Sequence, residues 1–368
     1  MKNLKDLQLH ELKELLIALG EKPFRAGQIF SWLYRSGGES ARSIDEMTDL
    51  SLALREKLRE AGCHAGVLEP ERVQISRLDG TRKYLFRLTD GNAIESVLMK
   101  YKYGNTVCVS SQAGCRMGCA FCASAIGGLA RGLTAGEMAE QLLAVERESG
   151  QTVNHIVVMG TGEPFDNYEN LAAFIRNMND KAGRNLGMRS ITVSTCGLAP
   201  VIERFAHDFP QVNLAISLHA PSDEIRSRMM PVNRKYPLAV LIPACRRYCE
   251  LTSRRVTFEY TLVRGVNDSP ACAQKLASLL SGMLCHVNLI PLNRVEETGL
   301  VAAEGRTAAE FRAYLESHGV PATIRREMGA DIDGACGQLR LSASAHKDGA
   351  KDSAKDGTGG SAKDGAKK

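Results

Sequence analysis

The chain has 368 residues, a hydrophobic fraction of 44%, a net charge of +5 and 11 cysteines. It contains no run of roughly 18 uncharged apolar residues, and Met1–His10 alternates charges with leucines, which excludes a membrane span and a signal peptide. An odd number of cysteines in a long chain without a secretory signal argues against a disulfide framework. These features predict a cytoplasmic protein with no membrane partner, and the charge alone does not establish a nucleic-acid partner.

The first part of the chain, residues 1–65, is expected to form a small helical domain. Its apolar residues recur at helical spacing at Leu12, Leu15, Leu16 and Leu19, at Ile29, Phe30 and Leu33, and at Leu52, Leu54 and Leu58.

Residues 66–104 are expected to form a β-hairpin extension. Apolar and polar residues alternate there, and Asp79-Gly80 and Asp90-Gly91 predict two-residue hairpin turns. The unit is rich in basic residues, which suits RNA but also suits a solvated sheet face: Arg72, Arg77, Arg82, Lys83, Arg87, Lys100 and Lys102.

Residues 105–341 predict an α/β core with a parallel sheet, because six short apolar runs alternate with segments long enough for helices. The runs are TVCVSS, HIVVMG, SITVST, VNLAISLH, VTFEYTLV and HVNLIPLN. Six units are fewer than the eight of a closed barrel, so a partial (βα)6 barrel is expected, and ATIRRE at 322–327 adds an edge strand or a cover. Residues 342–368 are rich in Lys, Asp, Gly, Ser and Ala and predict a disordered tail, or a weak tether to RNA.

The strongest motif is a run of three cysteines, Cys115, Cys119 and Cys122, directly after a predicted strand. Structural zinc sites need a fourth ligand, usually from a second cysteine pair, and no such pair follows. Three thiolates are also one short of an ordinary electron-transfer cluster. They suit an iron–sulfur cluster that leaves one iron open for a ligand.

Polar residues collect where the predicted strands end. The motif Gly160-Thr-Gly-Glu-Pro164 follows the second strand, and Ser194, Ser217-Leu-His219 and Pro291-Leu-Asn293 follow the third, fourth and sixth strands. Ligands bind at this edge of β/α folds, so these residues are expected to share a site with the cysteines.

The C-x-x-x-C-x-x-C motif resembles the radical S-adenosylmethionine (SAM) superfamily. Together with MGTGEPFDNYEN, HAPSDEIRSRMMPVNR and RREMGADIDGACGQLR, it closely resembles the RlmN family of dual-specificity RNA methyltransferases, to about Leu341. The resemblance implies a partial (βα)6 radical-SAM barrel, with a helix-hairpin-helix-like RNA-binding domain at residues 1–65 and a C-terminal catalytic loop. It implies a [4Fe-4S] cluster on the three cysteines and assigns the SAM pocket to Gly162, Glu163, Pro164, Ser194, Ser217, Leu218, His219 and Asn293.

The family's reaction methylates carbon 2 of adenosine and consumes two SAM molecules. By resemblance, Cys336 carries the methyl group, and Cys108 resolves the resulting protein–RNA adduct through a transient disulfide. Glu95 matches the proton acceptor, although a solvated strand carboxylate is its alternative reading. The other six cysteines, Cys63, Cys196, Cys245, Cys249, Cys272 and Cys285, match no catalytic role and are interpreted as structural.

The resemblance implies 23S ribosomal RNA and tRNA adenosine 37 as substrates, an electron donor such as flavodoxin, and a monomer. The basic hairpins and a loop region with Arg226, Arg228, Arg234 and Lys235 are compatible with RNA. Three alternatives remain open: methylation of carbon 8, whose enzymes usually lack the Pro164 equivalent, an RNA-binding module with structural zinc, and a radical activase that leaves a glycyl radical on a protein partner.

Overall fold

The computed structural model describes residues 1–292 and 299–332. Within these ranges the main sheet has ten strands in the order β14-β13-β12-β11-β10-β9-β6-β5-β4-β3. Neighbouring strands from β14 to β6 are parallel, and those from β6 to β3 are antiparallel. The sheet therefore joins the predicted β/α core and the predicted hairpin extension, and the expected fold class is confirmed.

The parallel part contains the six predicted apolar runs in chain order. Its strands are β6 (Gly104–Cys108), β9 (His155–Val158), β10 (Ile191–Thr195), β11 (Asn213–Ser217), β12 (Val256–Leu262) and β13 (Cys285–Pro291). The segment at 322–327 adds a short edge strand, β14 (Ala322–Ile324), so the edge-strand reading is the correct one.

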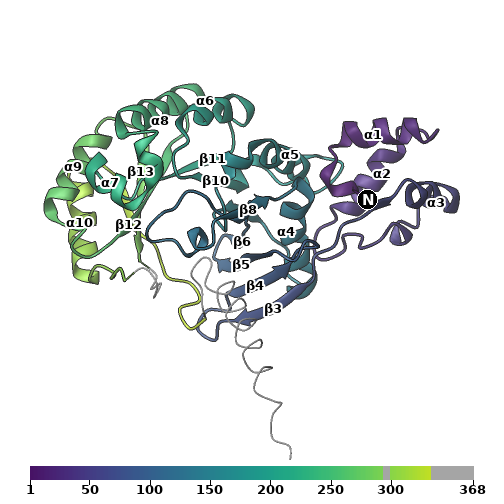
Figure 1. The fold of residues 1–368 in the computed structure, drawn as a ribbon, viewed down its shortest axis with the longest axis horizontal. Coiled ribbons are helices and arrows are strands. Elements are labelled where there is room, and N and C mark those ends of the chain that lie inside the picture. Colours follow the sequence, from purple (N-terminus) through teal and green to yellow (C-terminus); the bar gives the residue numbers. More distant parts are fainter. Residues whose placement is uncertain (293–298, 333–368) are drawn as a thin grey trace, which may run out of the picture.

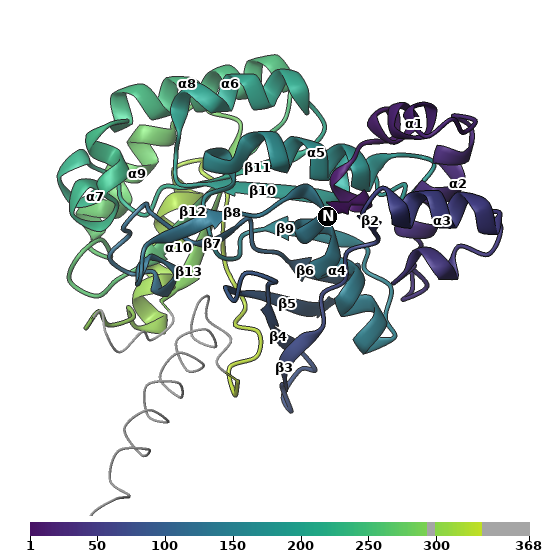
Figure 2. The ribbon, with the colours of Figure 1, turned by 45° about the vertical axis from the view of Figure 1, so that its right-hand side comes forward.

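Helices cover the outer face of the curved sheet, as Figures 1 and 2 show. They are α4 (Ala135–Ser149), α5 (Tyr168–Asn179), α6 (Ala199–Asp208), α7 (Asp223–Met229), α8 (Leu238–Thr252), α9 (Pro270–Leu280) and α10 (Gly305–Ser317). Branched strand residues such as Ile156, Val193 and Ile216 are buried in one continuous core with the apolar faces of these helices. Among the described residues, no helix is both long and apolar enough to cross a membrane.

The hairpin extension consists of β3 (Pro70–Ile75), β4 (Arg82–Arg87) and β5 (Ala93–Tyr101). The expected two-residue turns are wrong, because the loops between these strands span residues 76–81 and 88–92. In each loop the aspartate accepts a hydrogen bond from the residue two positions on, Asp79 from the Thr81 amide at 3.0 Å and Asp90 from the Asn92 amide at 2.9 Å. The side chains thus stabilise wider turns than the Asp-Gly pairs predict.

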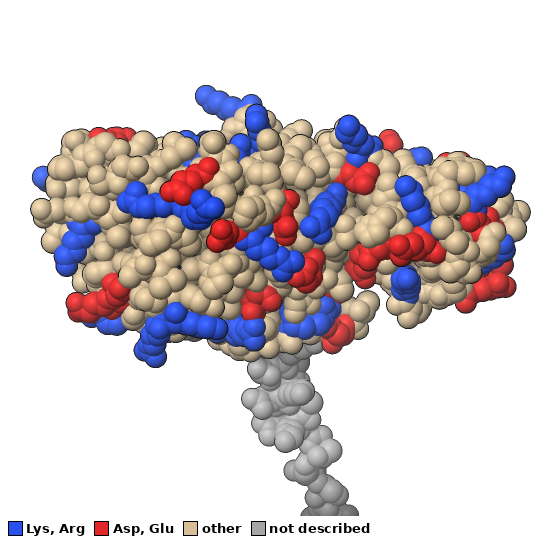
Figure 3. Space-filling model, turned by 90° about the horizontal axis from the view of Figure 1, so that it is seen from above, with Lys and Arg blue, Asp and Glu red and all other residues tan. Residues whose placement is uncertain are grey.

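The N-terminal helices lie at one end of the molecule (Figure 1) and are α1 (Leu9–Ala18), α2 (Arg25–Leu33) and α3 (Leu52–Glu60). A short parallel pair, β1 (Lys2–Asn3) and β2 (Cys63–His64), joins the two ends of this unit. Seen from above in Figure 3, acidic and basic side chains are interspersed over this end and over the barrel helices.

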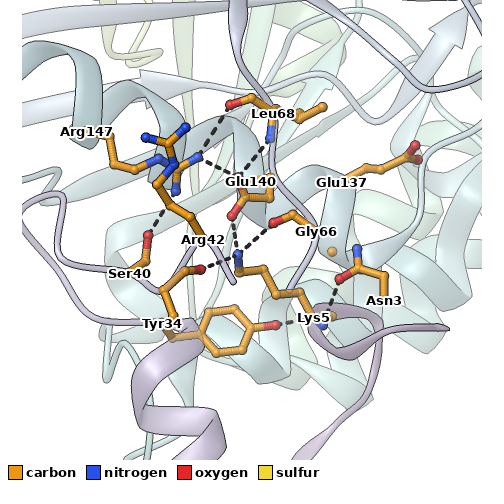
Figure 4. Close-up of polar contacts among 12 residues, drawn as sticks. Asn3, Lys5, Tyr34, Ser40, Arg42, Gly66, Leu68, Glu137, Glu140 and Arg147 are labelled. Carbon is orange, nitrogen blue, oxygen red and sulfur yellow. Dashed lines mark hydrogen bonds and ion pairs between the residues drawn. The ribbon is translucent and has the colours of Figure 1, made fainter. Parts of the chain in front are cut away.

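A buried polar network fixes the N-terminal unit on α4 (Figure 4). The Lys5 ammonium is fully buried, forms an ion pair with Glu140 and donates to the Gly66 carbonyl at 2.9 Å. The other carboxylate oxygen of Glu140 accepts from Arg147 at 2.7 Å and from the Leu68 amide at 3.1 Å. Charged groups excluded from water are stable only when paired in this way, so the network holds the unit in one orientation.

Candidate active site

The three cysteines lie on one closed loop. Strands β7 (Gln112–Gly114) and β8 (Leu129–Gly132) pair antiparallel on either side of it, and the Cys115 amide donates to the Gly128 carbonyl at 2.9 Å. A second contact fixes the tip, because the Ala120 amide donates to the Met229 carbonyl at the end of α7, at 2.8 Å. The loop is therefore held both at its base and against the barrel.

This loop opens into a cavity of about 240 Å³ at the carboxyl ends of the parallel strands. All three cysteines line it, together with five residues that the family resemblance assigns to the SAM pocket: Gly162, Glu163, Ser194, Ser217 and His219. Pro164 and Leu218 are buried next to these residues but do not line the cavity. Asn293 lies outside the described residues.

The donor set of the loop fits an iron–sulfur cluster. Burial raises the pKa of the Cys115 thiol to about 11, and burial together with the neighbouring Cys122 and Cys115 thiols raises the pKa of Cys119 further. Such thiols become thiolates when a metal supplies positive charge, and sulfur is the ligand that iron–sulfur clusters take.

Among the described residues, no three His, Cys, Asp or Glu side chains converge so that they could hold a single metal ion. A four-iron cluster takes each thiolate on a different iron, so its ligands need not meet at one point.

Glu163 is a buried carboxylate in the cavity wall. Its Oε1 accepts from the Phe165 amide at 2.9 Å and its Oε2 from the Cys196 amide at 2.7 Å. Burial raises the pKa of Glu163, and these hydrogen bonds oppose the rise. Gly162, at φ +107°, lets the chain pass so close to Gln112 that a Cβ would lie 2.5 Å from the Gln112 Cβ. The glycine thus places a negative group where a cationic ligand group could bind.

His219 is neutral and oriented. Its Nδ1 accepts from the Thr261 amide at 2.9 Å, so the ring proton is on Nε2, and burial lowers its pKa to about 3. The ring packs edge-on against Phe121 of the cysteine loop, with centroids 4.6 Å apart. This histidine is both a satisfied structural residue and part of the cavity wall.

Glu95 and Cys108 lie on the neighbouring strands β5 and β6. Glu95 is 4% exposed and lies 3.6 Å from the ammonium of Lys83, which is fully buried, so the solvated-carboxylate reading of Glu95 is wrong. Burial raises the pKa of the Cys108 thiol to about 11. Neither residue is part of the described cavity lining, and Cys336 lies outside the described residues, as does the tail at 342–368.

One interpretation of a single residue from the sequence needs correction. Arg226 is fully buried, so it is not available to contact RNA, whereas Arg228, Arg234 and Lys235 are exposed. The sequence offers no signal for this, because burial of a charged side chain cannot be read from its neighbours in the chain. Cys196, interpreted as structural, also lines the cavity and donates its backbone amide to Glu163.

Sequence reasoning also missed four polar residues of the cavity wall: Ser124, Glu259, Thr261 and Arg325. Glu259 is 6% exposed in the middle of β12, where it accepts from the Asn288 amide group at 2.8 Å. A glutamate inside the apolar run VTFEYTLV was the available signal, since parallel strands buried on both faces are normally apolar throughout.

Comparisons with known proteins agree with this arrangement. Residues 2–63 match the family model of the ribosomal RNA large subunit methyltransferase N-terminal domain, and residues 109–273 match the radical SAM superfamily. A probable dual-specificity RNA methyltransferase RlmN of Lachnospira eligens is 52% identical over 92% of this chain and 96% of the relative. Another of Thermoanaerobacter sp. strain X514 is 49% identical, over 92% and 98%.

Among solved structures, the chain is similar to a radical SAM methyltransferase from Sphaerobacter thermophilus. The TM-score is 0.86 at 49% identity, covering 92% of this chain and 99% of that one. Because this likeness extends over both the N-terminal unit and the barrel, it concerns the whole described architecture.

Proposed function

Because the chain belongs to the RlmN family of radical SAM RNA methyltransferases, we propose that it methylates carbon 2 of an adenosine in RNA. The substrates are an adenosine of the peptidyl-transferase centre in 23S ribosomal RNA and adenosine 37 of tRNAs. One observation carries the proposal: the three-cysteine loop opens into the cavity that Glu163, Ser194 and His219 line. The residues that would bind a cluster and those that would bind a cationic cofactor therefore line the same cavity.

Cys115, Cys119 and Cys122 hold the [4Fe-4S] cluster, and Glu163 with Gly162, Pro164, Ser194, Ser217, Leu218, His219 and Asn293 forms the pocket for SAM. When bound, cluster and cofactor supply one-electron chemistry that yields a carbon radical strong enough to remove hydrogen from a methyl group. Two SAM molecules are consumed for each methylation. The Glu163 carboxylate suits the amino group of the cofactor, since a buried anion binds an ammonium through a charge-assisted hydrogen bond.

Cys336 carries the methyl group and, after hydrogen removal, bonds through its methylene carbon to carbon 2 of the adenine. To restore the aromatic ring, the adduct radical gives up one electron, which the bound cluster would accept, and carbon 2 gives up its proton to Glu95, with the Lys83 ammonium as the nearby counter-charge. The Cys108 thiolate then attacks the Cys336 sulfur, so that an S–S bond forms while the sulfur–carbon bond breaks. The carbon leaves with the electron pair and takes a proton, which releases methylated RNA.

The raised pKa of Cys108 means that a base must take its proton before this attack. Burial on β6 keeps the thiol away from solvent oxidants until the adduct reaches it. The Cys108 environment thus suits a thiol that reacts once per turnover and is otherwise inert.

RNA reaches the site over a surface with exposed basic residues on two sides of the barrel: Arg72, Arg77, Lys100 and Lys102 on the hairpin extension, and Arg228, Arg234 and Lys235 after β11. A target base must leave its stack before it can enter, at a cost of a few kcal/mol. A flavodoxin-type protein delivers electrons, and the enzyme acts as a monomer in the cytoplasm.

The proposal is tested by mass spectrometry of nucleosides after anaerobic incubation of the reconstituted enzyme with RNA, reductant and SAM. Wild type yields 2-methyladenosine, Cys336→Ala yields none, and Cys108→Ala accumulates a protein–RNA crosslink. Cys249→Ala, which removes a half-buried thiol on α8, behaves as wild type and is the matched control. Product formation without Cys336, or 8-methyladenosine as the product, contradicts the proposal. Colourless protein after reconstitution, indifferent to SAM, supports the zinc-binding module instead.

A further inference from the structure

Arg226 is a completely buried arginine directly behind the cavity wall. It projects from α7, and its guanidinium makes four hydrogen bonds: Nε to the Leu218 carbonyl at 3.1 Å, Nη1 to Asn233 Oδ1 at 2.9 Å, and Nη2 to the Cys196 and Ser217 carbonyls at 2.7 and 3.2 Å. Cys196 and Ser217 line the cavity and follow or end the neighbouring strands β10 and β11. One planar group therefore joins two adjacent strand ends at the site.

The contact with Cys196 reaches the Glu163 carboxylate through the backbone of a single residue. Arg226 holds the carbonyl of Cys196, and the amide of the same residue donates to Glu163 Oε2 at 2.7 Å. The contacts with Ser217 and Leu218 fix the backbone immediately before His219, which has a left-handed φ of +54°. Glu163 and His219 thus depend on the same support.

All four acceptors of Arg226 are uncharged oxygens, and within the described residues no carboxylate forms an ion pair with it. Asp223, on the same helix, already accepts from Asn233 Nδ2 at 2.9 Å and from the Leu238 amide at 2.8 Å through its Oδ1. A buried cation that lacks a counter-charge is unfavourable.

Burial lowers the pKa of Arg226, and the thiols of Cys196 and Cys119 together with the Asp223 carboxylate oppose that shift. The guanidinium thus lies within electrostatic reach of a cluster cysteine as well as of Asp223. Because Asp223 does not bond to the guanidinium directly, further negative charge is expected in the cavity.

We propose that Arg226 is a positioning residue that fixes Glu163 and His219 for the cofactor, and that its positive charge balances the negative charge of the three thiolates and their cluster. This inference rests on the proposed function. Arginine suits both roles. The planar guanidinium forms a rigid fork of N–H donors that can bind several carbonyls at once, and its positive charge persists in a buried site.

The two roles are separated by two substitutions in the full-length, reconstituted protein. Arg226→Gln removes the charge and most of the fork, whereas Arg226→Lys keeps the charge and loses the fork. Arg312→Gln, on α10 with a side chain that is 45% exposed and outside the basic surface, is the matched control. The readouts are the midpoint potential of the cluster from an EPR-monitored titration, the dissociation constant for SAM from equilibrium dialysis, and the iron content.

We expect the midpoint potential of Arg226→Gln to become more negative, because the reduced cluster loses a nearby positive charge. Its dissociation constant for SAM rises about tenfold, the effect of weakening one charge-assisted hydrogen bond. Arg226→Lys retains the wild-type potential and loses affinity, and Arg312→Gln matches wild type in both.

A folded Arg226→Gln protein with wild-type potential and affinity overturns the inference. If that variant does not fold, Arg226→Lys decides, since unchanged affinity for SAM shows that the fork positions nothing. Wild-type protein that takes up neither cluster nor SAM shows instead that the proposed function itself is wrong.

Discussion

The carboxylate of Asp331 accepts a hydrogen bond from the Ser76 hydroxyl at 2.5 Å, although 254 residues separate them, and a second from the Arg77 amide at 2.7 Å. The segment after β14, yellow in Figure 1, thus reaches across to the loop between β3 and β4. There the Gly329 amide also donates to Asp79 at 2.9 Å. The hairpin extension therefore acts as the docking platform for the chain that leads to Cys336.

Asp331→Ala should slow methylation while leaving the free energy of unfolding nearly unchanged. The substitution removes both contacts of the segment with Ser76 and Arg77, and misplacement of a reacting group costs roughly tenfold to a hundredfold in rate. Single-turnover formation of 2-methyladenosine measures the effect. Asp268→Ala is the control, because Asp268 likewise accepts a backbone amide, that of Gly265 at 2.9 Å, in an exposed loop. Equal rates for the two variants show that the docking contact has no role.

Acid should release this docked segment before the barrel unfolds. Burial alone would raise the pKa of Asp79, but hydrogen bonds from Gly329, Thr81 and Ser76 lower it to about 2. A lowered pKa contributes stability that is present above the ordinary value near 4 and is lost as the pH falls towards 2. Hydrogen exchange should show residues 325–332 losing protection between pH 4 and 2, ahead of β12. Asp79→Asn should weaken this pH dependence but not abolish it, because hydrogen bonds from Ser76 and Arg77 also lower the pKa of Asp331, which docks the same segment. Protection that stays constant in wild type contradicts the assignment.

The sequence predicted the parallel strands and the strand-end residues because both depend on local patterns. Short apolar runs such as HIVVMG, separated by segments long enough for helices, favour buried parallel strands, and the polar residues that follow such strands meet at one edge of the sheet. Contacts between residues far apart in the chain could not be predicted in this way. Nothing in the chain distinguishes Arg226, which is buried, from Arg228, which is exposed two positions on, and nothing links Asp331 to Ser76.

The predictions of two-residue turns were wrong for a related reason, because contacts outside the turn change its length. Asp79-Gly80 and Asp90-Gly91 have the composition of two-residue turns, and both glycines do adopt left-handed backbone at φ +73° and +83°. The aspartates, however, bond to amides outside the pair, and Asp79 also bonds to Gly329 from the far end of the chain. A tertiary contact thus overrides the local preference in the first of these loops.

Loss of the buried partner of Lys5 should destabilise the protein strongly. Glu140→Ala leaves Lys5 and Arg147 without their shared carboxylate, which costs about 3 to 5 kcal/mol for a buried pair. Lys5→Met should cost less, because Glu140 keeps Arg147. Urea unfolding measures both free energies. The exposed pair of Arg306 and Glu310 is the control, and Glu310→Ala should change the free energy of unfolding by less than about 0.5 kcal/mol. Equal costs for Glu140→Ala and Lys5→Met argue against the shared-carboxylate explanation.

Glu95→Gln should separate cofactor cleavage from product formation. The amide keeps the shape of the side chain but cannot accept the carbon-2 proton, so 2-methyladenosine should fall about 100-fold while 5′-deoxyadenosine still forms. Both are measured by liquid chromatography and mass spectrometry. Glu71→Gln, which alters an exposed strand glutamate paired with Arg87, should leave both products unchanged. Wild-type yield of 2-methyladenosine from Glu95→Gln assigns the proton transfer to another group.

Gly114→Ala should prevent the cysteine loop from closing. Gly114 has φ +83°, and a Cβ there would lie 2.0 Å from the Gly128 carbonyl oxygen, which accepts the bond from Cys115 at the base of the loop. Backbone cannot move aside as a flexible side chain can, so we expect a folded barrel with most of its iron and sulfide uptake lost. Gly187→Ala is the control, because its backbone has φ −60° and no atom lies within 4 Å of an added Cβ. Full iron content in Gly114→Ala shows that loop closure is not what holds the cluster, and that the three thiols alone suffice.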